Sequence, residues 1–70
     1  MVDIKKKYGE RLRQLRKTKG LSQEELAFRS GLHRTYVSDL ERGTRNVSLE
    51  NIEKIAKVLG LELSEVFKGV

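Results

Sequence analysis

The sequence predicts an all-α protein with five helices in one domain, residues 1 to 70. Apolar residues recur at intervals of three and four along most of the chain, which is the period of a helix with one buried face. Glycines follow these apolar runs, where helices commonly end in the left-handed backbone conformation. No segment alternates apolar and polar residues over the length of a strand.

The first predicted helix covers residues 3 to 18. Four apolar residues spaced four, four and three positions apart define its buried face: Ile4, Tyr8, Leu12 and Leu15. Lys19 and Gly20 follow this face, and a glycine at that place is typical of a helix end.

Residues 22 to 42 predict two short helices that meet at a sharp turn. Ser22 and Glu25 have the spacing of a capping box, which begins the second helix. Gly31 follows that helix where a left-handed residue is needed, and the third helix then runs to Gly43. The inward-facing residues of these two helices are Leu26, Ala27, Val37 and Leu40.

The fourth predicted helix begins after Ser48, a good N-cap residue, and ends at Gly60. Its apolar face consists of Leu49, Ile52, Ile55, Ala56 and Leu59. A last short helix is expected to begin at Ser64 and to carry Val66 and Phe67.

Two short helices joined by a glycine turn form the helix-turn-helix arrangement, whose second helix enters the major groove of DNA. The small Ala27, Gly31 four residues later, and the apolar Val37 and Leu40 have the intervals that this motif needs. The charge agrees, because the chain carries +5 at pH 7 and has a pI near 9.8, which indicates a polyanionic partner. Residues 1 to 20 hold eight Lys and Arg against two acidic residues, although a basic helix alone is also typical of a solvated surface.

The segment GLSQEELAFRSGLHRTYVSDLERG, followed by SLENIEKIAKVLGL, resembles the Cro/C1-type (Xre family) helix-turn-helix regulators. The resemblance covers roughly residues 5 to 67. It implies a compact, five-helix, lambda-repressor-like DNA-binding domain with the helix-turn-helix at about residues 22 to 42. Within that family, HRTYVSDLERGTRNVS is similar to the controller proteins of restriction–modification systems.

The outer face of the third helix holds the candidate base-reading residues: Arg34, Thr35, Ser38 and Asp39. An ordinary solvated face would have the same position, opposite the buried residues. Arg34 at the helix start can donate two hydrogen bonds to guanine O6 and N7. Asp39 leaves three roles open: accepting from cytosine N4, discriminating against other bases, or orienting Arg34 or Arg42.

Five further residues are candidates for contact with the DNA backbone: Gln23, Tyr36, Arg42, Arg45 and Asn46. Gln23 begins the second helix, where backbone N–H groups and a side-chain amide suit a phosphate. For Tyr36 a core position and a DNA contact both stay open, and the resemblance to controller proteins implies the DNA contact. The other three follow or end the third helix, next to the expected phosphates.

Four residues are assigned structural roles: Ala27, Gly31, Arg16 and Glu41. Ala27 and Gly31 shape the turn between the second and third helices. The family resemblance implies that Arg16 and Glu41 form a pair, which joins the first helix to the end of the third. Such a pair is not necessarily stabilising, because desolvation offsets much of the attraction.

A homodimer on an inverted repeat is expected, because one recognition helix makes few base contacts and two-fold symmetry doubles them. The predicted dimer interface lies near the end of the chain and consists of Leu61, Leu63, Val66 and Phe67. The alternative for these residues is that they only close the core.

The sequence predicts a cytoplasmic transcription regulator and no enzyme. It has no cysteine and no glycine-rich phosphate loop, and its single histidine, His33, lacks the companion ligands of a metal site. We therefore expect no cofactor, no metal and no small-molecule ligand. No apolar run approaches the roughly 18 residues of a membrane span, so we expect no membrane partner. Two alternative functions are an antitoxin-type repressor that binds a partner toxin, and a non-specific nucleic-acid-binding protein.

Overall fold

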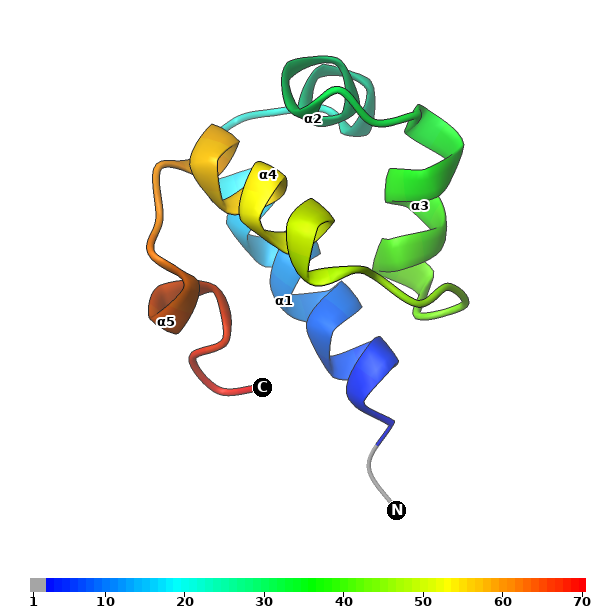
Figure 1. The fold of residues 1–70 in the computed structure, drawn as a ribbon, viewed down its shortest axis with the longest axis vertical. Helices are drawn as coiled ribbons and strands as arrows, with labels where there is room; N and C mark the ends of the chain where they lie inside the picture. The colour runs from blue at the N-terminus through cyan, green and yellow to red at the C-terminus, as the bar shows by residue number, and fades with distance from the viewer. Residues whose placement is uncertain (1–2) are drawn as a thin grey trace.

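The computed structural model describes residues 3 to 70, over which the chain forms five α-helices and no strand (Figure 1). In chain order the helices are α1 (Ile4–Thr18), α2 (Gln23–Ser30), α3 (Arg34–Arg42), α4 (Leu49–Leu59) and α5 (Leu63–Val66). The prediction of an all-α fold with five helices is confirmed. Residues 1 and 2 of the predicted domain lie outside the described range.

Short polar side chains begin three of the helices. The Asp3 side chain accepts a hydrogen bond from the N–H of Lys5 at 3.0 Å and begins α1. Ser22 and Glu25 form the predicted capping box of α2, with Ser22 Oγ 3.0 Å from the Glu25 nitrogen. Ser48 caps α4 in the same way. Each cap satisfies an N–H group that has no partner within its helix.

The turn between α2 and α3 depends on the backbone conformation of Gly31, whose φ is +74°. A Cβ added there would meet no atom within 4 Å, so the conformation and not the space requires glycine. The N–H of the next residue, Leu32, donates to the carbonyl oxygen of Ala27 at 2.8 Å, which closes the end of α2. The chain therefore changes direction within a few residues, as predicted.

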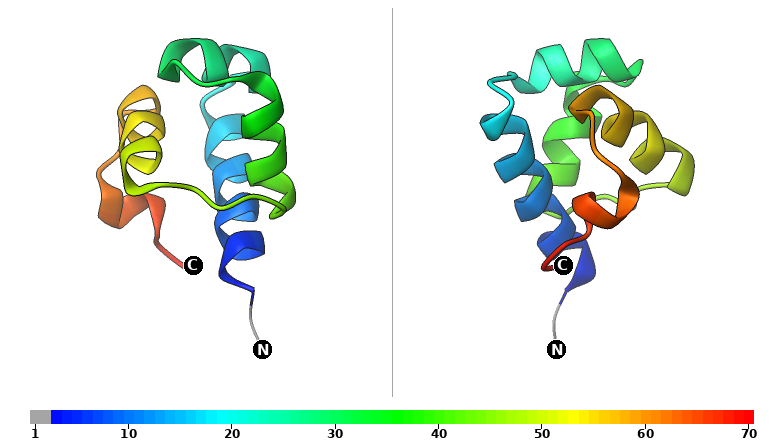
Figure 2. Two further views of the ribbon diagram at one scale, coloured as in Figure 1. Left: turned by 45° about the vertical axis from the view of Figure 1, so that its right-hand side comes forward. Right: turned by 90° about the vertical axis from the view of Figure 1, so that its left-hand side faces the viewer.

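The helices are arranged so that the outer side of α3 remains uncovered. Figure 2 shows α1 and α3 side by side, with α2 crossing at one end of the pair. α4 packs against α2 and α5, and α5 also contacts α1, on the side of the fold away from α3. Among the described residues, no helix lies on the outside of α3.

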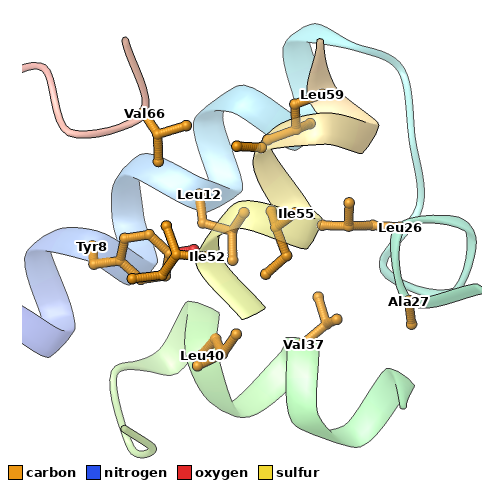
Figure 3. Packing of buried hydrophobic residues seen from close by; sticks show 11 residues of the cluster. Tyr8, Leu12, Leu26, Ala27, Val37, Leu40, Ile52, Ile55, Leu59 and Val66 are labelled. Carbon is orange, nitrogen blue, oxygen red and sulfur yellow. The ribbon is translucent and has the colours of Figure 1, made fainter. Parts of the chain in front are cut away.

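Apolar residues from all five helices form one core (Figure 3). It consists of Tyr8, Leu12, Leu26, Ala27, Val37, Leu40, Ile52, Ile55, Ala56, Leu59 and Val66. Val66 was expected at a dimer surface, but it is fully buried, with 0% of its surface exposed. It fills the space between α1 and α4, so the alternative that it closes the core is the correct one for this residue.

Three sequence expectations need correction at the ends of helices. Ile4 and Leu49 continue the apolar spacing of α1 and α4, but they are 61% and 80% exposed. Both occupy the first turn of their helix, so the periodicity extends past the point where packing ends. α5 begins at Leu63 and not at Ser64, because the N–H of Glu62 before it donates to the Glu65 side chain at 3.1 Å.

Gly9 lets α1 and α3 approach each other, which the sequence did not reveal. It is buried in the middle of α1, and a Cβ built on it would overlap the carbonyl oxygens of Leu40 and Glu41 in α3. The two backbones are therefore in direct contact at this point. The position of α3 against the rest of the fold depends on the absence of a side chain at Gly9.

Replacing Gly9 with alanine should lower the free energy of unfolding by about 1–3 kcal/mol, since the added methyl group must push two backbones apart. In an isolated helix the same substitution would be stabilising, because alanine has the higher helix propensity. A loss of stability would therefore come from the contact with α3. Denaturant unfolding measures it. Gln14→Ala, on the exposed surface of the same helix, is the control and should change stability by less than about 0.5 kcal/mol. A Gly9→Ala protein as stable as the control would contradict the close contact.

Candidate nucleic-acid interface

The uncovered side of α3 presents polar and cationic side chains. Arg34 and Thr35 are exposed and Ser38 is half-buried, and together with Arg42 they line one shallow hollow. The buried Val37 and Leu40 hold the opposite side of the helix in the core. Guanidinium and hydroxyl groups on an exposed helix face are the groups that contact base edges and phosphates.

A second hollow lies on the other flank of α3 and shares Thr35 with the first. Its lining comes from the turn before α3, from α3, from the following loop and from α4: Gly31, Leu32, His33, Thr35, Tyr36, Arg45 and Asn51. His33 occupies the N-cap position of α3, but its side chain makes no cap hydrogen bond. The ring therefore does not cap the helix, and its exposed position leaves it free to lie near a phosphate.

Tyr36 joins α3 to α4 and remains half-buried. Its hydroxyl oxygen accepts a hydrogen bond from the Asn51 amide at 3.0 Å. The Arg45 guanidinium lies over the ring, 5.2 Å from its centroid, which is the geometry of a cation–π contact. Asn51 was not among the residues predicted from the sequence, because its spacing within α4 gives no sign that it faces α3.

Asp39 contacts two arginines that were expected to bind phosphate. Its carboxylate, 17% exposed, forms an ion pair with Arg42 and a second one with Arg45, where Arg45 Nε lies 3.6 Å from Oδ2. Arg42 belongs to the last turn of α3 and Arg45 to the loop after it. The carboxylate therefore holds side chains from both segments, and the ion pairs of Asp39 involve Arg42 and not Arg34.

Arg16 and Glu41 form the pair that the family resemblance implied. Arg16 Nε lies 2.6 Å from Glu41 Oε2 and Nη2 lies 3.0 Å from Oε1, while Nη1 donates to the Leu21 carbonyl at 2.8 Å. The side chains are only 11% and 4% exposed, and the hydrogen bond to Glu41 raises the pKa of Arg16. The Gln23 amide also donates to Glu41, at 3.1 Å. Gln23 was expected to contact a phosphate, and here its side chain supports this buried pair.

Asn46 lies away from the outer face of α3 and shares a groove with only one other candidate, Arg45. It is exposed and lines a groove with residues of α1, of the loop between α3 and α4, of α4 and of the C-terminal segment: Ile4, Lys5, Tyr8, Arg45, Val47, Ile52 and Phe67. In this groove the ring centroids of Tyr8 and Phe67 lie 5.8 Å apart. Burial raises the pKa of Tyr8, whose hydroxyl has no hydrogen-bond partner among residues 3 to 70.

Phe28 is an exposed aromatic residue that was not among the candidates predicted from the sequence. It lies on the outer side of α2 and is 85% exposed. It lines a surface hollow with Ser22, Glu24, Glu25 and Arg29. Its position was available from the sequence, because Leu26 and Ala27 mark the inner face of α2 and Phe28 falls outside it.

Residues 12 to 66 match the family model described as helix-turn-helix. The chain belongs to the helix-turn-helix family. This family consists of DNA-binding transcription regulators, so the resemblance to Cro/C1-type regulators is confirmed.

Several relatives of this helix-turn-helix chain are control proteins. It is 59% identical to control protein C.BamHI of Bacillus amyloliquefaciens over 61 residues, which cover 86% of this chain and 75% of that protein. It is 52% identical to control protein C.MunI of a Mycoplasma species over 71 residues, covering 100% and 96% of the two chains. The crystal structure of the restriction–modification controller protein C.AhdI from Aeromonas hydrophila matches with a TM-score of 0.91 at 57% identity, covering 94% and 100% of the two chains.

Within residues 3 to 70, no group of three or more His, Cys, Asp or Glu side chains is placed to hold a metal ion. None of the helices in that range is both long enough and apolar enough to cross a membrane.

Replacing Arg16 with methionine should lower the free energy of unfolding by about 3–5 kcal/mol, because the carboxylate of Glu41 would remain buried without its partner. The double variant Arg16→Met/Glu41→Leu removes both charges and should recover most of that loss. Denaturant unfolding of the single and double variants measures both effects. A double variant as unstable as Arg16→Met would show that the cost does not come from an unpaired charge.

Proposed function

We propose that the chain is a sequence-specific transcription regulator that binds double-stranded DNA as a homodimer on an inverted-repeat operator. The observation that carries the proposal is the uncovered side of α3. There Arg34, Thr35 and Ser38 share one hollow with Arg42, while the opposite side of the helix is fixed in the core. This arrangement supports insertion of α3 into the major groove as a rigid element.

In this proposal the residues of α3 and the following loop have separate tasks. Arg34, at the start of α3, donates two hydrogen bonds to a guanine, and Thr35 and Ser38 contact neighbouring base edges. Arg42 and Arg45 bind phosphates on the two flanks, because each lies in one of the hollows beside the helix. Tyr36, which lines the second hollow, adds an apolar surface beside Arg45.

We further propose that the regulated genes belong to a restriction–modification system. The support is the similarity to control proteins C.BamHI and C.MunI and to the controller protein C.AhdI. In this role the concentration of the protein itself controls its regulatory activity. The protein acts in the cytoplasm, where the DNA lies.

The proposed dimer interface consists of Leu61, Leu63 and Phe67. Leu63 and Phe67 are 45% and 38% exposed, which is much apolar surface for so short a helical segment. Val66 is left out because it is buried within one protomer.

The size of one protomer is compatible with a dimer on adjacent half-sites. The longest dimension of the protein is 33 Å, so one protomer spans about one turn of DNA, which is roughly 34–36 Å.

The experiment that tests sequence specificity is selection of bound duplexes from a random pool, followed by competition. A specific regulator keeps the selected duplex against excess random DNA. A protein that binds all duplexes equally would favour the non-specific alternative and would remove this proposal.

Arg34→Ala should weaken binding to the selected duplex by about 1–3 kcal/mol and relax the preference at one base pair in each half-site. Fluorescence titration of single-base variants of that duplex measures both effects. Arg13→Ala, which removes an equal charge from the exposed surface of α1, is the control and should leave the base preference unchanged. Unchanged discrimination by Arg34→Ala would remove the residue from base reading.

Leu63→Asp should give a folded monomer that binds the operator about a hundredfold more weakly, because only one half-site is then held. Sedimentation and titration measure the two effects. Leu49→Asp is the control, since Leu49 is 80% exposed but lies outside the proposed interface. Inserting half a helical turn, about five base pairs, between the half-sites should be as damaging as Leu63→Asp. A wild-type protein that stays monomeric on its operator would contradict the dimer.

A further inference from the structure

Asp39 places a carboxylate on α3, whose outer side otherwise carries the cationic and hydroxyl groups that we propose contact DNA. It lies in the last turn of α3, where the helix dipole disfavours a negative charge. An approaching phosphate backbone would disfavour it as well. Both effects work against an acidic residue at this position, so the reason for its presence must lie in its contacts with other side chains.

The contacts of Asp39 divide into backbone contacts that shape the turn and side-chain contacts that hold arginines. Its carbonyl oxygen accepts from the N–H of Thr44 at 3.1 Å and from the Thr44 hydroxyl at 3.3 Å. Its two carboxylate oxygens go to different partners, Oδ1 to Arg42 and Oδ2 to Arg45. The carboxylate is therefore not needed for the turn, and its partners are the two arginines proposed to bind phosphate.

We infer that the Asp39 carboxylate competes with DNA phosphates for Arg42 and Arg45, and thereby limits the affinity of the regulator for DNA of any sequence. The inference rests on the proposed function. Each arginine has to exchange the Asp39 carboxylate for a phosphate when DNA binds. The loss of these ion pairs offsets part of the electrostatic attraction between the arginines and the phosphates. Duplexes that also offer base contacts to α3 retain the protein, whereas random DNA holds it weakly.

The exposure of the three side chains suits such an exchange. Arg42 and Arg45 are 65% and 52% exposed, so a phosphate can reach them, while Asp39 is 17% exposed and stays beside them. Ion pairs with exposed partners are weak, so the carboxylate lowers DNA affinity moderately and does not prevent binding. The stacking of Arg45 on Tyr36 keeps its guanidinium near α3 during the exchange.

The experiment measures the binding of Asp39→Asn and Asp39→Ser to a random-sequence duplex and to the duplex selected by the wild type. Both variants remove the charge and keep the backbone contacts with Thr44. Affinity for random DNA should rise about three- to tenfold at about 0.1 M salt, and affinity for the selected duplex should rise by the same factor. Thermal melts establish that each variant is folded.

Two controls separate this competition from the change in total charge. Glu10→Gln raises the net charge equally but lies in a hollow between α1 and the C-terminal residues Lys68 and Gly69, so it should have a smaller effect. In an Arg42→Gln/Arg45→Gln background, Asp39→Asn should gain no more affinity than Glu10→Gln does. A gain that persists there would overturn the inference, because the competed groups would be absent.

Two other outcomes would also overturn it. Weaker binding to the selected duplex alone, with a changed preference at one base pair, would make Asp39 a base-reading residue. Weaker binding to both duplexes would mean that the carboxylate orders the arginines for phosphate. A wild type with no preferred duplex would instead remove the proposed function, and that result is visible before any variant is made.

Discussion

The direct contact between α1 and α3 is the constraint on which the rest of the structure depends. Gly9 allows the two backbones to touch, and the buried Arg16–Glu41 pair, with Arg16 Nε 2.6 Å from Glu41 Oε2, fastens the helices along the same side. Arg16 also binds the Leu21 carbonyl and thereby fixes the entry to α2. The orientation of α3 is therefore fixed by its contacts with α1, on its inner side, and not by the turn at Gly31 alone.

Two carboxylates of α3 have different tasks because they point to opposite sides of the helix. Glu41 is nearly buried and receives Arg16 from α1, which gives it a structural role. Asp39, two residues earlier, faces the loop and receives Arg42 and Arg45. One short helix thus uses acidic groups both to hold its position in the fold and to moderate the charge that it offers to a polyanion.

In a chain of 70 residues, some apolar residues fill the core and others remain at the surface. Val66 closes the core between α1 and α4, although its neighbours Leu63 and Phe67 remain partly exposed. A domain of this size buries only about 60% of its unfolded surface, so some apolar residues must stay outside. Leu63 and Phe67 lie close together in the chain and thus suit a partner surface, whereas the more exposed Leu49 lies at the start of a different helix.

The sequence by itself determined the five helices, the capping box of α2 and the turn at Gly31, because local spacing and local backbone preference control these features. It also singled out the face of α3 that carries Arg34, since helical periodicity separates the outer from the inner side. Only the tertiary structure decided contacts between distant segments. The overlap at Gly9, the bond from Asn51 to Tyr36 and the two partners of Asp39 depend on how whole helices pack, and no local pattern encodes that geometry.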